Sequence, residues 1–84
     1  MSYTVRLTRS AEKEMMKLPQ TVRRRIDRHL LALEEQPYGP GHKMLAGQFG
    51  FRVAVGVYRI IYQVDDKARE VEVTTIRHRR EAYR

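Results

Sequence analysis

Helix-like and strand-like patterns are segregated along this chain, and that segregation constrains the fold more than any other feature. Apolar residues recur at helical spacing between residues 9 and 36. Apolar and polar residues then alternate over residues 49–55, 57–65 and 69–77. Gly56 marks the first connection between these stretches, and Asp65-Asp66-Lys67 marks the second. Strands this close in sequence predict an antiparallel meander.

A first strand and two helices are predicted before the meander. Residues 3–8 alternate as a strand, and Thr8 or Ser10 can cap a short helix that runs through Lys17. Pro19 ends that helix and is well placed to start a second one, which reaches about residue 36. The apolar positions of the two helices are Ala11, Met15 and Leu18, and then Val22, Ile26, Leu30 and Leu33.

The predicted order is β-α-α-β-β-β in a single domain, residues 1–84. We expect an α+β fold in which both helices pack on one face of a small, mostly antiparallel sheet. Residues 37–41 break the second helix, and residues 42–48 predict a loop or a short turn. The other sheet face and the C-terminal tail are left for function.

Composition excludes several classes of protein. The chain has no cysteine, so disulfides and thiolate zinc sites are impossible. Its N-terminus has no apolar signal segment, and no apolar run approaches the ~20 residues of a membrane span. We therefore expect a cytoplasmic protein with no membrane partner.

The positive charge is large and comes mostly from arginine. The chain carries 17 basic and 10 acidic residues, a formal net charge of +7. Arginine has a planar fork that suits phosphate oxygens, and it stacks on bases. The charge therefore predicts a nucleic acid or an acidic protein as partner. The basic residues of the second helix are compatible with rRNA contact and equally with an ordinary solvated face.

Arg59 is a cation set within an apolar strand. Alternation places it on one face with Ile61 and Gln63. The opposite set is more apolar and is the expected core: Tyr58, Ile60, Tyr62 and Val64. Arg59 should therefore point to the open face, either as a binding residue or as a surface arginine paired with an acid.

Five motifs occur in an order that resembles the RelE/ParE superfamily of bacterial and archaeal toxins. They are Tyr3-Thr4-Val5, Lys17-Leu18-Pro19, Lys43-Met44-Leu45-Ala46-Gly47, the strand from Tyr58 to Val64, and His78-Arg79-Arg80-Glu81-Ala82-Tyr83. The resemblance covers nearly the whole chain. An arginine at the end of the last strand, followed by a basic run and a tyrosine, is similar to the RelE branch. Members of that branch are ribosome-dependent endoribonucleases that cut mRNA in the decoding site.

The resemblance implies roles for three arginines. Arg59 matches a residue that holds the scissile phosphate, and Arg77 matches one that stabilises the transition state. The pKa of arginine is too high for easy proton donation, so electrostatic stabilisation is the expected role of Arg77. Arg52 falls where relatives carry a basic residue. Ala54 falls where some carry a second lysine, which leaves the general base unassigned.

The C-terminal residues and one loop lysine complete the expected site. Tyr83 matches a tyrosine that stacks on or orients the substrate nucleotide, and stacking on a base contributes ~1–3 kcal/mol. His78 is the candidate acid or base, with RNA binding as its alternative role. The expected phosphate contacts are Lys43, Arg79 and Arg80.

The sequence offers no pair of acids at magnesium-binding spacing, no phosphate-binding glycine loop and no HExxH motif. We therefore expect a metal-independent, cofactor-free RNase, in which the 2′-hydroxyl attacks the adjacent phosphate. The products would be a 2′,3′-cyclic phosphate or 3′-phosphate and a 5′-hydroxyl.

The resemblance also implies partners and alternatives. An acidic antitoxin would fold on binding and cover the site, and the pair would reach operator DNA through that antitoxin. The expected RNA partners are mRNA and rRNA of the 70S ribosome. Two other functions remain open on this fold: inhibition of DNA gyrase, as for ParE-like toxins, and non-catalytic RNA binding.

Overall fold

The computed structural model describes residues 2–39, 41–44, 50–78 and 80. The elements in chain order are β1 (Thr4–Leu7), α1 (Arg9–Met16), α2 (Gln20–Glu35), β2 (Lys43–Met44), β3 (Phe51–Val55), β4 (Tyr58–Asp65) and β5 (Glu70–His78). The strands form one sheet in the order β1-β5-β4-β3-β2. β1 runs parallel to β5, and the other neighbours are antiparallel. The predicted α+β fold with a mostly antiparallel sheet is confirmed.

The sequence pattern missed one strand. Residues 42–48 were expected to form a loop or a short turn, yet β2 pairs with β3 through Lys43 opposite Arg52 and Met44 opposite Phe51. A strand of two residues is too short to show an alternating pattern in the sequence. Its pairing depends on where β3 lies rather than on its own side chains.

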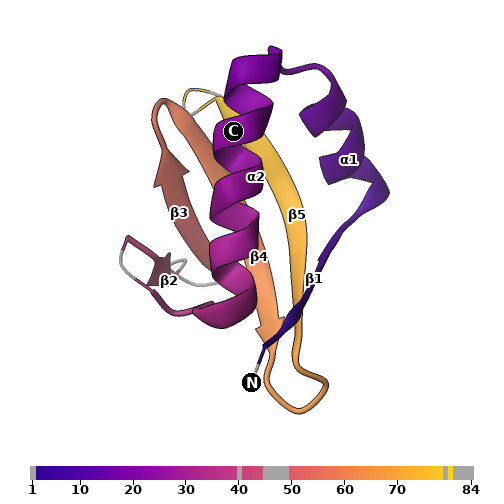
Figure 1. The fold of residues 1–84 in the computed structure, drawn as a ribbon, viewed down its shortest axis with the longest axis vertical. Helices are drawn as coiled ribbons and strands as arrows, with labels where there is room; N and C mark the ends of the chain where they lie inside the picture. Colours follow the sequence, from indigo (N-terminus) through magenta and orange to yellow (C-terminus); the bar gives the residue numbers. More distant parts are fainter. Residues whose placement is uncertain (1, 40, 45–49, 79, 81–84) are drawn as a thin grey trace.

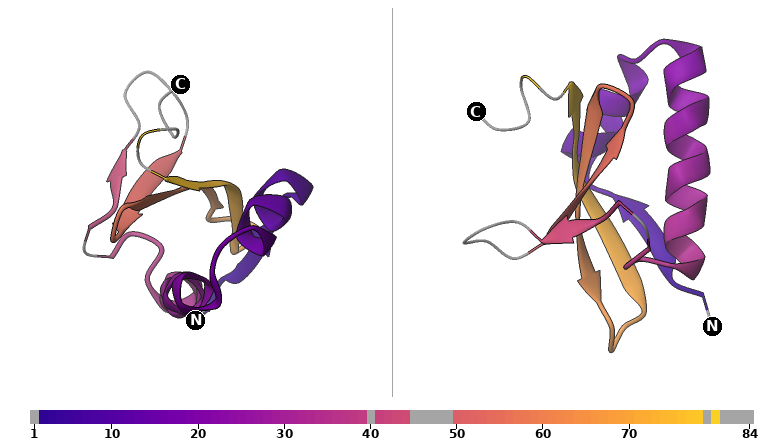
Figure 2. Two further views of the ribbon diagram at one scale, coloured as in Figure 1. Left: turned by 90° about the horizontal axis from the view of Figure 1, so that it is seen from above. Right: turned by 90° about the vertical axis from the view of Figure 1, so that its left-hand side faces the viewer.

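α2 lies across one face of the sheet, and α1 lies beside β5 (Figure 1). Figure 2 shows α2 running along one face of the strands, with the opposite face uncovered by any helix, while α1 lies near the β5 edge. Within the described ranges, no helix is long and apolar enough to cross a membrane. The uncovered side is called the open face below.

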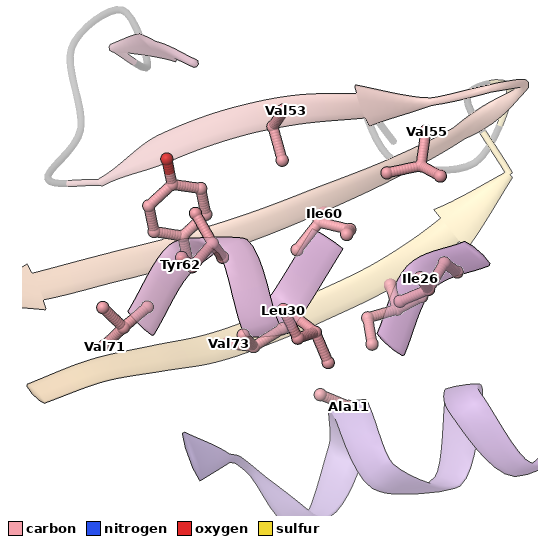
Figure 3. Packing of buried hydrophobic residues seen from close by; sticks show 11 residues of the cluster. Ala11, Ile26, Leu30, Val53, Val55, Ile60, Tyr62, Val71 and Val73 are labelled. Carbon is pink, nitrogen blue, oxygen red and sulfur yellow. The ribbon is translucent and has the colours of Figure 1, made fainter. Parts of the chain in front are cut away.

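The core lies between the helices and the sheet (Figure 3). Ile26, Leu30 and Leu33 of α2 and Ala11 of α1 are buried against the strands. The buried strand residues are Val53, Val55, Ile60, Tyr62, Val71, Val73 and Ile76. Fully burying an aliphatic side chain of this size contributes about 1.5–3 kcal/mol, so these positions fix which face of each strand is covered.

Two local signals place the helices. The Thr8 hydroxyl accepts a hydrogen bond from the Ala11 backbone N–H at 3.2 Å and so caps α1, which decides between the two predicted capping residues. Pro19 occupies the N-cap position of α2 without a side-chain cap, as its fixed φ allows. The two helices are therefore separated where the sequence predicted.

An aspartate and two tyrosines join distant segments at the far end of the sheet. Asp66, in the β4–β5 turn, accepts hydrogen bonds from the hydroxyls of Tyr3 at 2.7 Å and Tyr38 at 2.9 Å. These bonds hold the pKa of the Asp66 carboxyl below its ordinary value. Burial, followed by the bond to Asp66, raises the pKa of Tyr38 to about 12. Arg69 stacks over the Tyr3 ring at 4.2 Å.

Candidate functional site

Arg59 and Arg77 stand directly opposite each other on neighbouring strands. Arg59 of β4 pairs with Arg77 of β5, and Ala54 of β3 pairs with Arg59 from the other side. Residues directly opposite in an antiparallel pair share a face, and the neighbours of Arg59 on its own strand, Ile60 and Tyr62, are buried on the helix side. Like charges placed this way destabilise a sheet, so the pair is a poor choice for stability alone.

A β-bulge decides that Arg77 reaches the open face. Ile61 pairs with Thr75 while Tyr62 pairs with Val73, which leaves Thr74 as an extra residue on β5. The extra residue reverses the alternation of β5, so that Val73 and Ile76 are both buried although they differ in parity. Without the bulge, Arg77 would share the face of Val73.

Three cations line a small pocket on the open face. The pocket has a volume of about 160 Å³ and is lined by Gly41, Lys43, Arg52, Ala54 and Arg59. Lys43 enters it because β2 pairs with β3, which sets Lys43 opposite Arg52. Two arginine guanidinium groups and a lysine ammonium group around one concavity suit a phosphate group. Ala54 occupies the position between them and adds no charge.

Glu14 of α1 holds Arg77, and sequence reasoning did not single it out. One carboxylate oxygen accepts a hydrogen bond from the Ile76 backbone N–H at 3.0 Å, and the other pairs with the Arg77 Nε. The Glu14 side chain is 15 % exposed and that of Arg77 is 46 % exposed. A signal was available in the sequence: Glu14 lies three residues after Ala11, on the inner stripe of α1, where an acid needs a partner.

His78 lies on the other side of the sheet from the arginine pair. It pairs with Tyr58, and the two rings meet edge-to-face with centroids 5.7 Å apart. The Arg80 backbone N–H donates to the His78 Nδ1 at 3.3 Å, and the Arg80 side chain is exposed. The structure thus brings Lys43, Arg52 and Arg59 together in the open-face pocket and sets Arg77 opposite Arg59. His78 lines the concavity beside α1, as Arg77 also does. Tyr83 and Arg79 lie outside the described residues.

Nothing in the described part of the chain forms a cluster of three or more histidine, aspartate or glutamate side chains that could hold a metal ion. Burial or hydrogen bonding shifts the pKa values of Tyr3, Tyr38, Tyr62 and Asp66. Tyr3, Tyr38 and Asp66 lie at the end of the sheet where β4 turns into β5, and Tyr62 lies in the core. None of these four groups lines the open-face pocket.

Comparison with known protein families places the chain. A family model described as the ParE toxin of the type II toxin–antitoxin system parDE matches residues 5–83. The chain belongs to this ParE-toxin family. It is thus a toxin of a type II toxin–antitoxin system, and the expected membership of the RelE/ParE superfamily is confirmed.

Similar proteins of known name or structure carry RelE-type names. Toxin RelG of Mycobacterium tuberculosis is 33% identical over 88 residues, covering 100% of this chain and 99% of that protein. The toxin–antitoxin complex RelBE2 of Mycobacterium tuberculosis matches with a TM-score of 0.85 and 27% identity, over 93% of this chain and 99% of that one. The intact RelBE complex of E. coli matches with a TM-score of 0.82 and 29% identity, over 92% and 96%. The toxin therefore has the RelE-like fold along nearly its full length.

Proposed function

We propose that this toxin is a ribosome-dependent endoribonuclease that cleaves mRNA in the ribosomal A site. The observation that carries the proposal is the arginine pair, Arg59 opposite Arg77, next to the pocket lined by Lys43 and Arg52. A phosphodiester held there would meet positive charge from four strands, β2 to β5. Glu14 offsets part of the repulsion within the arginine pair, and a polyanionic substrate would offset it further.

The chemistry follows from the RNA itself. The 2′-hydroxyl oxygen attacks the adjacent phosphorus and loses its proton, the bond from phosphorus to the 5′-oxygen breaks, and that oxygen takes up a proton. The products are a 2′,3′-cyclic phosphate and a 5′-hydroxyl. Arg59 and Arg52 hold the phosphate, and Arg77 stabilises the charge that develops on its oxygens.

The ribosome supplies what the arginines cannot. Arginine stays protonated at neutral pH and is a poor base. Without a good base among the arginines, much of the rate acceleration must come from positioning, which can remove much of the barrier. The main task left to the ribosomal A site is therefore to orient the 2′-hydroxyl in line with the leaving oxygen. We assign Tyr83 to stacking on the substrate nucleotide, and Arg79 and Arg80 to phosphate contacts. His78 is assigned to RNA binding.

An antitoxin is the expected protein partner. The similar chains from Mycobacterium tuberculosis and E. coli belong to toxin–antitoxin complexes. A net charge of +7 favours an acidic antitoxin segment that folds on this surface and covers Arg59 and Arg77. The pair would contact operator DNA through the antitoxin, inside the cytoplasm.

Primer extension on an mRNA bound to 70S ribosomes tests the proposal. We expect cuts in phase with codons that require the ribosome and are absent from naked mRNA. Arg59→Ala and Arg77→Ala should each lower cleavage by about 100-fold, because each removes a donor to the charged transition state. Arg6→Ala is the matched control, since Arg6 pairs with Glu70 and Glu72 on a different part of the sheet. Wild-type protein that makes no cuts at micromolar concentration would refute the proposal.

Gyrase inhibition is the second candidate, because the matching family model carries the ParE name. It predicts that the purified toxin blocks DNA supercoiling by gyrase. A toxin that leaves supercoiling intact while cutting ribosome-bound mRNA would exclude this candidate.

A further inference from the structure

A groove separate from the open-face pocket lies between α1 and the end of β5. Its volume is about 860 Å³. One wall is α1 and its C-cap residue, with Arg9, Lys13 and Lys17. The other wall is formed by Tyr58 and His78 on the helix side of the sheet. None of these five residues lines the open-face pocket. The groove is therefore a distinct surface with its own chemistry.

The α1 wall is a row of three cations. Arg9, Lys13 and Lys17 are four residues apart, so they follow one face of the helix at steps of about 6 Å. All three side chains are exposed. Among the described residues that line the groove, Glu14 is the only acid, and its carboxylate is engaged by Ile76 and Arg77. A flexible polyanion with regularly repeated charges would match this row.

The opposite wall is aromatic. Tyr58 and His78 meet edge-to-face there, and both are half-buried, so one surface of the pair is held by packing while the other lines the groove. Rings fixed beside a basic row are what single-stranded nucleic acid binds, because bases stack on the rings while phosphates follow the cations. An acidic peptide would use the cations and gain nothing from the rings.

Arg77 connects the groove to the candidate site. It lines the groove and also stands opposite Arg59, which lines the open-face pocket. Arg77, paired with Glu14, thus stands between the cations Arg52 and Arg59 on one face and the row on α1.

We propose that this groove is a second binding site for single-stranded RNA, which holds nucleotides flanking the phosphate bound at Arg59. The proposal rests on the proposed function for the identity of the ligand. Lys13 and Lys17 should then contribute to the affinity for a longer RNA strand. They should not contribute to the affinity for a trinucleotide, which is confined to the open-face pocket.

Fluorescence anisotropy with 2′-O-methyl RNA, which cannot be cleaved, tests this assignment. The probes are a trinucleotide and a strand of about nine nucleotides, within the range of lengths that single-strand sites cover. The groove variant is Lys13→Gln/Lys17→Gln. The control is Arg24→Gln/Arg28→Gln, which removes the same charge from exposed positions of α2 that do not line the groove.

We expect the groove variant to bind the longer strand about tenfold more weakly and to bind the trinucleotide as the wild type does. A plot of log binding constant against log salt concentration should become less steep by about 1.4, which is ~0.7 for each lost phosphate contact. Equal losses in the two double variants would overturn the proposal, since they would reflect net charge alone. Unchanged binding of the longer strand would overturn it as well.

An Arg59→Ala background separates this proposal from the proposed function. If the longer strand still depends on Lys13 and Lys17 there, while the wild type cuts no ribosome-bound mRNA, the groove stands and the nuclease does not. If polyglutamate binds through Lys13 and Lys17 and RNA does not, the groove is a protein-docking surface and the RNA assignment is wrong.

Discussion

Single residues determine the charge of the candidate site. Arg59 and Arg77 repel each other across the strand pair, and Glu14 offsets that repulsion by engaging Arg77 from α1. Ala54, between Arg52 and Arg59 on the same pocket wall, contributes no group that could take up a proton. We therefore expect the candidate site to bind phosphate and stabilise negative charge better than it transfers protons.

Replacing Glu14 tests whether it positions Arg77. Glu14→Gln keeps an acceptor for the Ile76 N–H and removes the charge beside Arg77. We expect the single-turnover cleavage rate on saturating ribosome-bound mRNA to fall about tenfold, because a misplaced donor stabilises the transition state less. The RNA affinity should not weaken, since an anion has been removed. The free energy of unfolding should fall by only about 0.5–1 kcal/mol for this partly exposed pair.

Glu12→Gln is the control for that measurement, because Glu12 is an exposed acid on the same helix. If both variants cleave at the wild-type rate, Glu14 contributes only to stability and does not position Arg77.

At the scale of elements, strand pairing rather than strand content builds the site. The bulge in β5 determines which face of the sheet Arg77 lies on. The pairing of the two-residue β2 with β3 places Lys43 opposite Arg52. The segment between α2 and β2 must be fixed for that pairing to form. Tyr62 fixes it from the core, because its hydroxyl donates to the Pro37 carbonyl oxygen at 2.7 Å.

Tyr62→Phe should destabilise the protein and change its response to alkali. Burial raises the pKa of Tyr62 to about 12, from an ordinary value of 10.0. Its contribution to stability is therefore complete below about pH 10 and lost as pH rises toward 12. The variant should lose about 1 kcal/mol at neutral pH, since the Pro37 oxygen loses its donor. Urea unfolding at a series of pH values measures both effects.

The alkaline decline should be shallower in this variant and should not vanish, because the pKa of Tyr38 is also raised to about 12. An alkaline decline as steep as that of the wild type would show that Tyr62 does not titrate with unfolding.

At the scale of the whole molecule, charges and polar contacts are divided between the two ends of the sheet. The arginine pair and both basic sites lie toward the start of β4 and the end of β5. Asp66 lies at the opposite end, where it joins the first residues, the segment after α2 and the β4–β5 turn. The end that carries the candidate site can thus hold like charges close together, while hydrogen bonds at the other end join distant segments of the chain.

Asp66→Ala should lower the urea midpoint at neutral pH by removing the acceptor for Tyr3 and Tyr38. These bonds lower the pKa of Asp66, so its contribution is present above the ordinary value of 3.8 and is lost as pH falls through the lowered one. The midpoints of variant and wild type should therefore converge in acid. A constant difference down to about pH 2 would contradict a role for the Asp66 charge.

The sequence by itself determined the elements and their inner faces. The caps, the breakers and the apolar periods placed both helices and the three C-terminal strands to within a few residues, because these signals are local. Alternation along β4 also placed Arg59 away from the core correctly. The five motifs gave the superfamily, since they preserve an order that extends along most of the chain.

The tertiary structure alone decided how the cations meet. The bulge at Thr74, the pairing of β2 and the contact from Glu14 to Arg77 all depend on partners distant in sequence. Alternation along the last strand already sets His78 on the opposite face from Arg77, and the register between β4 and β5 gave it Tyr58 as its partner. A local pattern fixes which way a side chain points on its own strand, whereas its neighbours are set by the pairing between strands.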